Sequence, residues 1–201
     1  MSTVLFSIEE HLQKSWSKFK EAPVFWIAIS LFSIALGAPS SMSPSITVFV
    51  TIVSMYFSAS ITLMTINYMK GNTVSINDLI GINVLTFLHY MITSFLCGIA
   101  VVFGLIFLII PGIYIGARLM FAHYLVVDQG YSFDRAISES WKMTEGNTWN
   151  LILLCCAMFL ILVAGFLALL IGLLIAIPVT SFCTASIYLV FANQSSQRIE
   201  I

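Results

Sequence analysis

Arg118 is the residue whose type and position point most directly to a function. It lies near the middle of a long apolar stretch, between Pro111 and Asp128. Burying an arginine at that depth of a membrane costs at least about 2.5–3.5 kcal/mol on insertion scales. All nine Asp and Glu residues lie outside the apolar stretches, so no carboxylate is expected beside it. Arg118 should therefore meet backbone carbonyls, water in a cavity, a lipid headgroup or a ligand anion.

Three further side chains could share a site with Arg118. Tyr114 precedes it by about one helical turn and falls on the same helix face. His89 is expected in the preceding span, and His123 in the same span as Arg118 but on another helix face. Both could form a ligand pocket or a proton path with Arg118. The alternative is that Arg118 snorkels to the surface and only anchors a short helix. In that case the histidines are packing residues, and the sequence leaves both interpretations open.

No established catalytic or metal-binding pattern accompanies these residues. There is no His-Glu-x-x-His motif, no nucleophile elbow and no phosphate-binding loop. The four cysteines lie in apolar runs without metal-ligand spacing. A net charge of −1 without a basic patch argues against nucleic-acid binding. We therefore predict no enzymatic activity, no cofactor, no metal site and no nucleic-acid partner.

The composition identifies the elements that must position Arg118 as membrane-spanning helices. Of the residues, 60% are hydrophobic and 8% are charged, whereas soluble domains carry roughly 25% charged residues. Such a chain cannot cover a water-facing surface. Four long apolar stretches occupy about residues 22–38, 45–69, 82–127 and 148–193.

The last two apolar stretches are too long to cross a bilayer once, because about 20 helical residues suffice. Each contains a glycine followed by a proline, Gly104 with Pro111 and Gly172 with Pro178. We predict that each stretch folds back between its glycine and its proline. The prediction is an all-α integral membrane protein with about six transmembrane helices in three hairpins.

The charged residues orient these helices. Apart from Arg118, every Lys and Arg lies before the first span, after the last, or in a connection on the same side as the termini. The positive-inside rule then places both termini in the cytoplasm. Four tryptophans near the same face are predicted interfacial anchors: Trp16, Trp26, Trp141 and Trp149. The charged N-terminal segment lacks the apolar core of a secretory signal.

A short pattern repeats before the hairpins. Residues 7–16 and 132–141 share a leading Ser, an acid and a final Ser-Trp pair at one constant offset, and residues 75–80 form a shorter echo. Each copy predicts a short amphipathic helix that begins at a Ser cap and lies in the membrane interface. A single membrane domain over 1–201 is expected, with repeat-like units at about 7–70, 75–127 and 132–193.

Hydroxyl side chains form a stripe along the second span. Thr51, Ser54, Ser58, Thr62 and Thr65 recur at heptad spacing. Such residues could line a polar conduit, although contact between helices is their commoner use.

Residues 108–150 resemble a known group of proteins. Pro111-Gly112 follows an apolar run, the next span ends in Val127-Asp128, and an Ala-x-x-x-Ser-Trp segment ending at Trp141 precedes Gly146-Asn147. This pattern resembles largely uncharacterised bacterial membrane-protein families related to the membrane domain of glycerophosphoryl diester phosphodiesterase. The resemblance implies a six-helix module in the bacterial cytoplasmic (inner) membrane. It implies no hydrolase activity here, because the chain has no room for a catalytic domain.

These observations together favour a non-catalytic multi-pass membrane protein. It is expected to bind anionic membrane lipid, or a membrane-protein partner or second copy of itself, through the bundle and its cytoplasmic helices. The alternative is a small transporter or channel with a polar path near Arg118.

Overall fold

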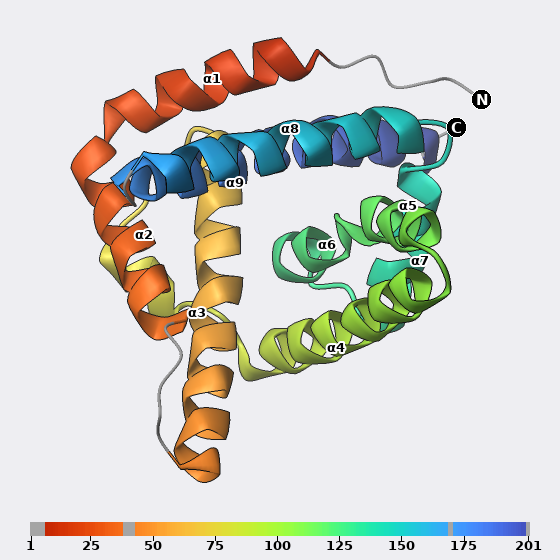
Figure 1. The fold of residues 1–201 in the computed structure, drawn as a ribbon, viewed down its shortest axis with the longest axis horizontal. Helices are drawn as coiled ribbons and strands as arrows, with labels where there is room; N and C mark the ends of the chain where they lie inside the picture. Colours follow the sequence, from red (N-terminus) through yellow and green to blue (C-terminus); the bar gives the residue numbers. More distant parts are fainter. Residues whose placement is uncertain (1–6, 38–42, 169–170, 200–201) are drawn as a thin grey trace.

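The computed structural model describes residues 7–37, 43–168 and 171–199, and the regular elements in those ranges are all helical (Figure 1). This confirms the predicted all-α class. In chain order the elements are α1 (Ile8–Glu21), α2 (Pro23–Gly37), α3 (Pro44–Met69), the 3-10 helix η1 (Ile76–Ile80), α4 (Val84–Phe107), α5 (Ile109–Leu119), α6 (Ala122–Gln129), α7 (Phe133–Met143), α8 (Thr148–Leu167) and α9 (Ile171–Ile199).

Five helical segments are long and apolar enough to cross a membrane, and a sixth is counted if α1 and α2 form one bent span. The five include α3, α4, α8 and most of α9, together with the Ile109–Gln129 segment that α5 and α6 share. The chain is therefore a multi-pass membrane protein, and these five to six candidate spans fit the about six that the sequence predicts.

Helix α1 bends by 100° from α2 and packs along α9. Ser15 and Phe19 on its inner face are buried, and the His11 ring Nδ1 lies 2.6 Å from Ser186 Oγ of α9. Ser7 caps its first turn by accepting from the Glu10 N–H. The sequence analysis placed the apolar face of this helix in lipid, whereas the structure packs it largely on protein.

The other two predicted amphipathic segments differ in length. Residues Ile76–Ile80 form only a short 3-10 helix, closed by a bond from the Ser75 N–H to the Asp78 carboxylate at 2.7 Å. Helix α7 is longer and packs against α4, α5 and α6. The internal repeat therefore stays a prediction, since the second copy is much reduced.

Two glycine pairs close the α4–α5 and α8–α9 hairpins. A Cβ on Gly104 would lie 2.8 Å from the Cα of Gly112, and a Cβ on Gly172 would lie 2.7 Å from the Cα of Gly165. The first chain reversal falls at Leu108, inside the predicted interval. The second lies before Gly172, so its predicted position between Gly172 and Pro178 is wrong.

Pro178 does not mark a chain reversal, which is why the predicted position of the second reversal is wrong. It lies inside α9, which continues through it. A proline removes one backbone hydrogen bond, but membrane helices tolerate this loss because neighbouring groups compensate for it.

Helix α9 lies at the centre of the bundle. It packs against α1, α2, α3, α7 and α8. In Figure 1 the α8–α9 pair runs across the view, whereas α3 runs up it. In an 18-residue window of the Gly172–Ser195 segment, 56% of the residues are buried inside the protein.

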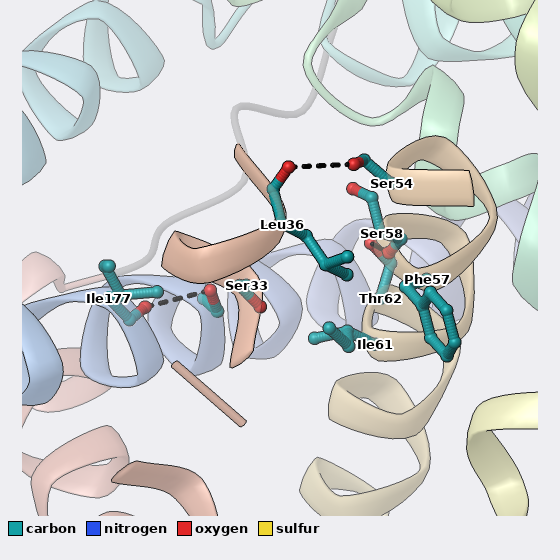
Figure 2. A pocket seen from close by; sticks show the side chains of 9 residues that line it. Ser33, Leu36, Ser54, Phe57, Ser58, Ile61, Thr62 and Ile177 are labelled. Carbon is teal, nitrogen blue, oxygen red and sulfur yellow. Dashed lines mark hydrogen bonds between the residues drawn. The ribbon is translucent and has the colours of Figure 1, made fainter. Parts of the chain in front are cut away.

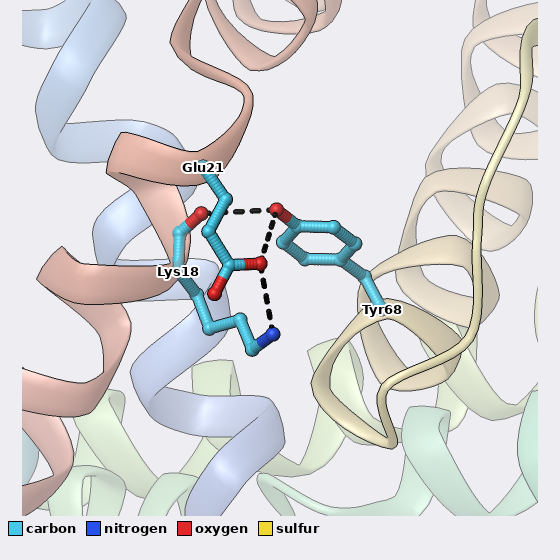
Figure 3. Close-up of polar contacts among 3 residues, drawn as sticks. All are labelled: Lys18, Glu21 and Tyr68. Carbon is cyan, nitrogen blue, oxygen red and sulfur yellow. Dashed lines mark hydrogen bonds and ion pairs between the residues drawn. The ribbon is translucent and has the colours of Figure 1, made fainter.

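Polar contacts fix the end of α3 to α1. The Tyr68 hydroxyl lies 3.0 Å from the Lys18 carbonyl oxygen and 3.3 Å from the Glu21 carboxylate, which also pairs with Lys18 Nζ at 2.9 Å (Figure 3). The single Tyr68 proton is shared between these two acceptors, and the contact holds the α1–α2 corner on α3.

Asp128, at the end of α6, joins two further helices. Its largely buried carboxylate pairs with Lys70, which follows α3, and accepts a hydrogen bond from the Tyr188 hydroxyl of α9 at 2.9 Å. A buried carboxylate needs such partners, because leaving a buried charge unpaired costs several kcal/mol.

The close approach of α4 and α5 predicts different effects for two glycines of the same helix. Gly104→Ala should destabilise the protein by about 1–3 kcal/mol through overpacking. Gly98→Ala is the matched control, because nothing lies within 4 Å of a Cβ at that position. Unfolding in detergent measures both, and equal stabilities would contradict the tight hairpin.

Docking of α1 should weaken in acid. Burial is the main cause that lowers the pKa of His11, and the Lys14 charge lowers it further. The undocked ring therefore takes up its proton at higher pH than the docked ring, so docking free energy is lost as the pH falls below about 6.5. Hydrogen exchange of α1 amides, corrected for intrinsic rates, should increase at pH 5.5 relative to pH 7.5. A His11→Gln variant should lose that difference, and unchanged protection of the native chain would refute the expectation.

Candidate functional site

A helix break positions Arg118. Helix α5 ends at Leu119 and α6 begins at Ala122, so the last carbonyls of α5 lose their intrahelical partners. The Arg118 carbonyl instead accepts hydrogen bonds from Ser140 Oγ at 2.9 Å and Thr144 Oγ1 at 3.3 Å. Both hydroxyl residues are fully buried. Arg118 therefore lies at a break inside its span, which the sequence analysis treated as one continuous helix.

The Arg118 side chain is buried against two aromatic rings. Only 5% of the residue is exposed. Its guanidinium carbon lies 4.6 Å from the Trp141 ring centroid and 5.9 Å from that of Tyr114, within the range of cation–π attraction. The predicted neighbourhood of Tyr114 and Arg118 is present, and Trp141 is a second aromatic partner.

The Arg118 guanidinium lacks a compensating anion in the described part of the chain. Its one hydrogen bond is from Nη1 to Thr148 Oγ1, at 3.4 Å, and no carboxylate lies within ion-pair distance. Its Nε is buried without a partner. An unmet buried donor costs about 1–3 kcal/mol, and more when charged. The Nε side of a guanidinium matches the oxygens of a carboxylate or phosphate.

Asn147 is a candidate that the sequence analysis did not select. It directly precedes Thr148, is 1% exposed, and neither its Oδ1 nor its Nδ2 has a hydrogen-bond partner. Its only sequence signal was the Gly146-Asn147 pair before a span, which does not reveal that the amide is buried.

The two histidines lie in other surroundings. His123 Nε2 lies 3.0 Å from Ser94 Oγ of α4, and the ring packs edge-on against Tyr90. His89 packs near Phe133, and its Nδ1 is buried without a partner. No hydrogen bond in the described ranges joins either ring to Arg118, and their grouping with Arg118 in one site stays a prediction.

The four tryptophans divide into two groups. Trp16, Trp141 and Trp149 are 45%, 38% and 72% exposed, so their rings are available to headgroups. Trp26 is 1% exposed and packs at 4.7 Å from Phe182, measured between ring centroids. Trp26 is a core residue and not an interfacial anchor, because the bend between α1 and α2 turns it onto α9.

A second polar feature lies between α2, α3 and α9. A cavity of about 360 Å³ is bordered by Ser33, Ser54, Ser58, Thr62 and Ser181. Figure 2 shows the first four of these around it. Part of the hydroxyl stripe of α3 therefore faces a cavity. Arg118 does not border it. The described residues contain no group of three His, Cys, Asp or Glu side chains that could hold a metal ion.

Removing a hydroxyl that supports the helix break should destabilise the site. Ser140→Ala leaves the Arg118 carbonyl with one donor fewer and should cost about 1–2 kcal/mol. Ser138→Ala is the control, since Ser138 is exposed on the same helix. Thermal unfolding in detergent should separate the two variants, and a Ser138→Ala loss as large as that of Ser140→Ala would count against this role.

Comparison with known proteins places the chain in a family. Residues 86–194, more than half of the chain, match the model for the membrane domain of glycerophosphoryl diester phosphodiesterase. This segment extends from α4 into α9 and includes Arg118, Trp141 and Asn147. No curated protein and no solved structure shows significant similarity. The chain therefore belongs to the family of the membrane domain of glycerophosphoryl diester phosphodiesterase.

Proposed function

We propose that this membrane protein binds the anionic headgroup of a lipid at Arg118 and does so without catalysis. The observation that carries the proposal is a buried guanidinium whose Nε has no partner and which no described carboxylate neutralises. A headgroup phosphate would supply both the missing charge and the missing acceptor. Asn147 directly precedes Thr148, the hydrogen-bond partner of Arg118, and its two unpaired amide atoms would contribute to the same site.

The position of the aromatic residues supports access from the headgroup region. Trp141 and Trp149 are exposed on either side of Asn147 in the sequence, and indole rings prefer the level of the headgroups. The Arg118 guanidinium lies beneath Trp141. A phosphate at this level reaches the guanidinium without entering the hydrocarbon core.

The distribution of charge supports an orientation with α1 and α7 on the cytoplasmic side of a bacterial inner membrane. Six basic residues are expected on that side, in α1, in α7 or directly after the end of α3: Lys14, Lys18, Lys20, Lys70, Arg135 and Lys142. An excess of Lys and Arg is typical of cytoplasmic segments. Anionic lipids in that leaflet would meet Arg118 from the same side.

Native mass spectrometry of the protein in nanodiscs that contain phosphatidylglycerol and phosphatidylethanolamine tests the proposal. Arg118→Gln should lower bound phosphatidylglycerol by about tenfold or more, as expected for losing a charged hydrogen bond of about 1.5–3 kcal/mol. Arg118→Lys should bind at an intermediate level, because it keeps the charge but lacks the planar donor edge.

Arg135→Gln is the matched control for this measurement. Arg135 also lies over an aromatic ring, 4.0 Å from the Tyr131 centroid, but it is exposed on α7. The Arg135→Gln variant removes the same charge and should leave phosphatidylglycerol binding nearly unchanged. The proposal fails if Arg118→Gln retains native binding, or if both variants lose it equally.

A further inference from the structure

The cavity between α2, α3 and α9 carries a separate inference, independent of the Arg118 site. It combines hydroxyl groups with the apolar side chains of Leu36, Phe57, Ile61 and Ile177. No charged residue borders it. Its volume of about 360 Å³ lies in the range of small-molecule sites.

Most of the hydroxyl protons at the cavity are already committed. Besides a shorter contact within its own helix, Ser54 Oγ lies 3.2 Å from the Leu36 carbonyl oxygen across the α2–α3 contact (Figure 2). The serine and threonine side chains donate to backbone carbonyls one turn earlier, at 2.8–2.9 Å: Ser33 to Ile29, Ser54 to Val50, Thr62 to Ser58 and Ser181 to Ile177. The free hydrogen-bonding capacity of these four groups is therefore mainly that of oxygen lone pairs.

The charge of a suitable ligand follows from these lone pairs. An anion would face acceptor oxygens and no cationic side chain. A cation would find no carboxylate, and moving an unpaired charge out of water is costly. An uncharged ligand with hydrogen-bond donors fits the lining best, and its carbon atoms can contact the apolar side chains.

The inner end of the cavity adds a donor. A smaller cavity shares Ser33, Ile61, Ile177 and Ser181 with the larger one and is also bordered by Trp26. The buried Trp26 Nε1 meets the geometric criteria for a hydrogen bond with none of the described residues, and the Tyr68 ring is its neighbour at 5.2 Å between centroids. A ligand that reaches this end would benefit from offering an acceptor as well as donors. A hydroxyl group does both.

We propose that this cavity binds an uncharged polyol group, which could come from a free small polyol or from the head of a neutral lipid. Ser33, Ser54, Thr62 and Ser181 supply acceptors, and the apolar residues contact the carbon skeleton.

The test uses the full chain in phosphatidylcholine nanodiscs with two probes. Radiolabelled glycerol represents a free polyol and is measured by scintillation proximity, while monooleoylglycerol represents a neutral lipid and is measured by native mass spectrometry. The variant Thr62→Val/Ser181→Ala removes two cavity acceptors whose own protons are donated within their own helices. Binding of at least one probe by the native chain, reduced about tenfold in this variant, is expected.

Thr47→Val/Thr51→Val is the control, because both residues are exposed on α3 and neither borders the cavity. It should bind like the native chain. Binding of glycerol alone identifies a free solute as the source, and binding of monooleoylglycerol alone identifies a lipid. The proposal is overturned if the native chain binds neither probe, or if the cavity variant binds both as the native chain does. Phosphatidylglycerol binding at Arg118 should be the same in all three proteins.

Discussion

Contacts with α9 hold the parts of this bundle together. The helix packs against segments from both ends of the chain and from its middle. Lipid provides no hydrophobic force between helices, so their association depends on close packing and on polar contacts. The buried face of α9 has the residues for both, with small side chains at Cys183 and Ala185 and hydroxyl groups at Ser186 and Tyr188. The Arg118 site depends on the same helix indirectly, because Asp128 anchors α6 to Tyr188 and α6 follows the break at which Arg118 lies.

Asp128 and Arg118, two charged residues of the same broken span, differ in how far the protein compensates their charge. Asp128 has a lysine and a tyrosine as partners, so its charge is compensated within the protein. Arg118 has two aromatic rings and one long hydrogen bond, which leave most of its charge uncompensated. Asp128 is therefore best explained as a structural residue that joins helices. Arg118 is the residue for which we propose a lipid headgroup as the partner.

The sequence was sufficient for the properties that composition and apolar length determine. The helical class, the number of spans and the reversal near Leu108 follow from them. A proline did not by itself identify the position of a chain reversal, because Pro111 lies near a helix start whereas Pro178 lies inside a helix. The site was predictable only in part. Arg118 and Tyr114 share one helix face, but the contacts of Trp141 and Thr148 with Arg118 depend on how α7 and α8 pack, which no local pattern specifies.

The pairing of α1 with α9 has a consequence for the order in which the protein is made. Roughly 150 residues separate Glu21 from Ile171, which corresponds to roughly 8–30 s of translation at about 5–20 residues per second. During that interval Phe19 and its neighbours have no α9 to cover them. Docking of α1 can therefore occur only after the last helix has emerged from the ribosome. Until then its uncovered face distinguishes a chain that lacks α9 from one that contains it, which is the kind of difference that chaperones and quality-control proteases detect.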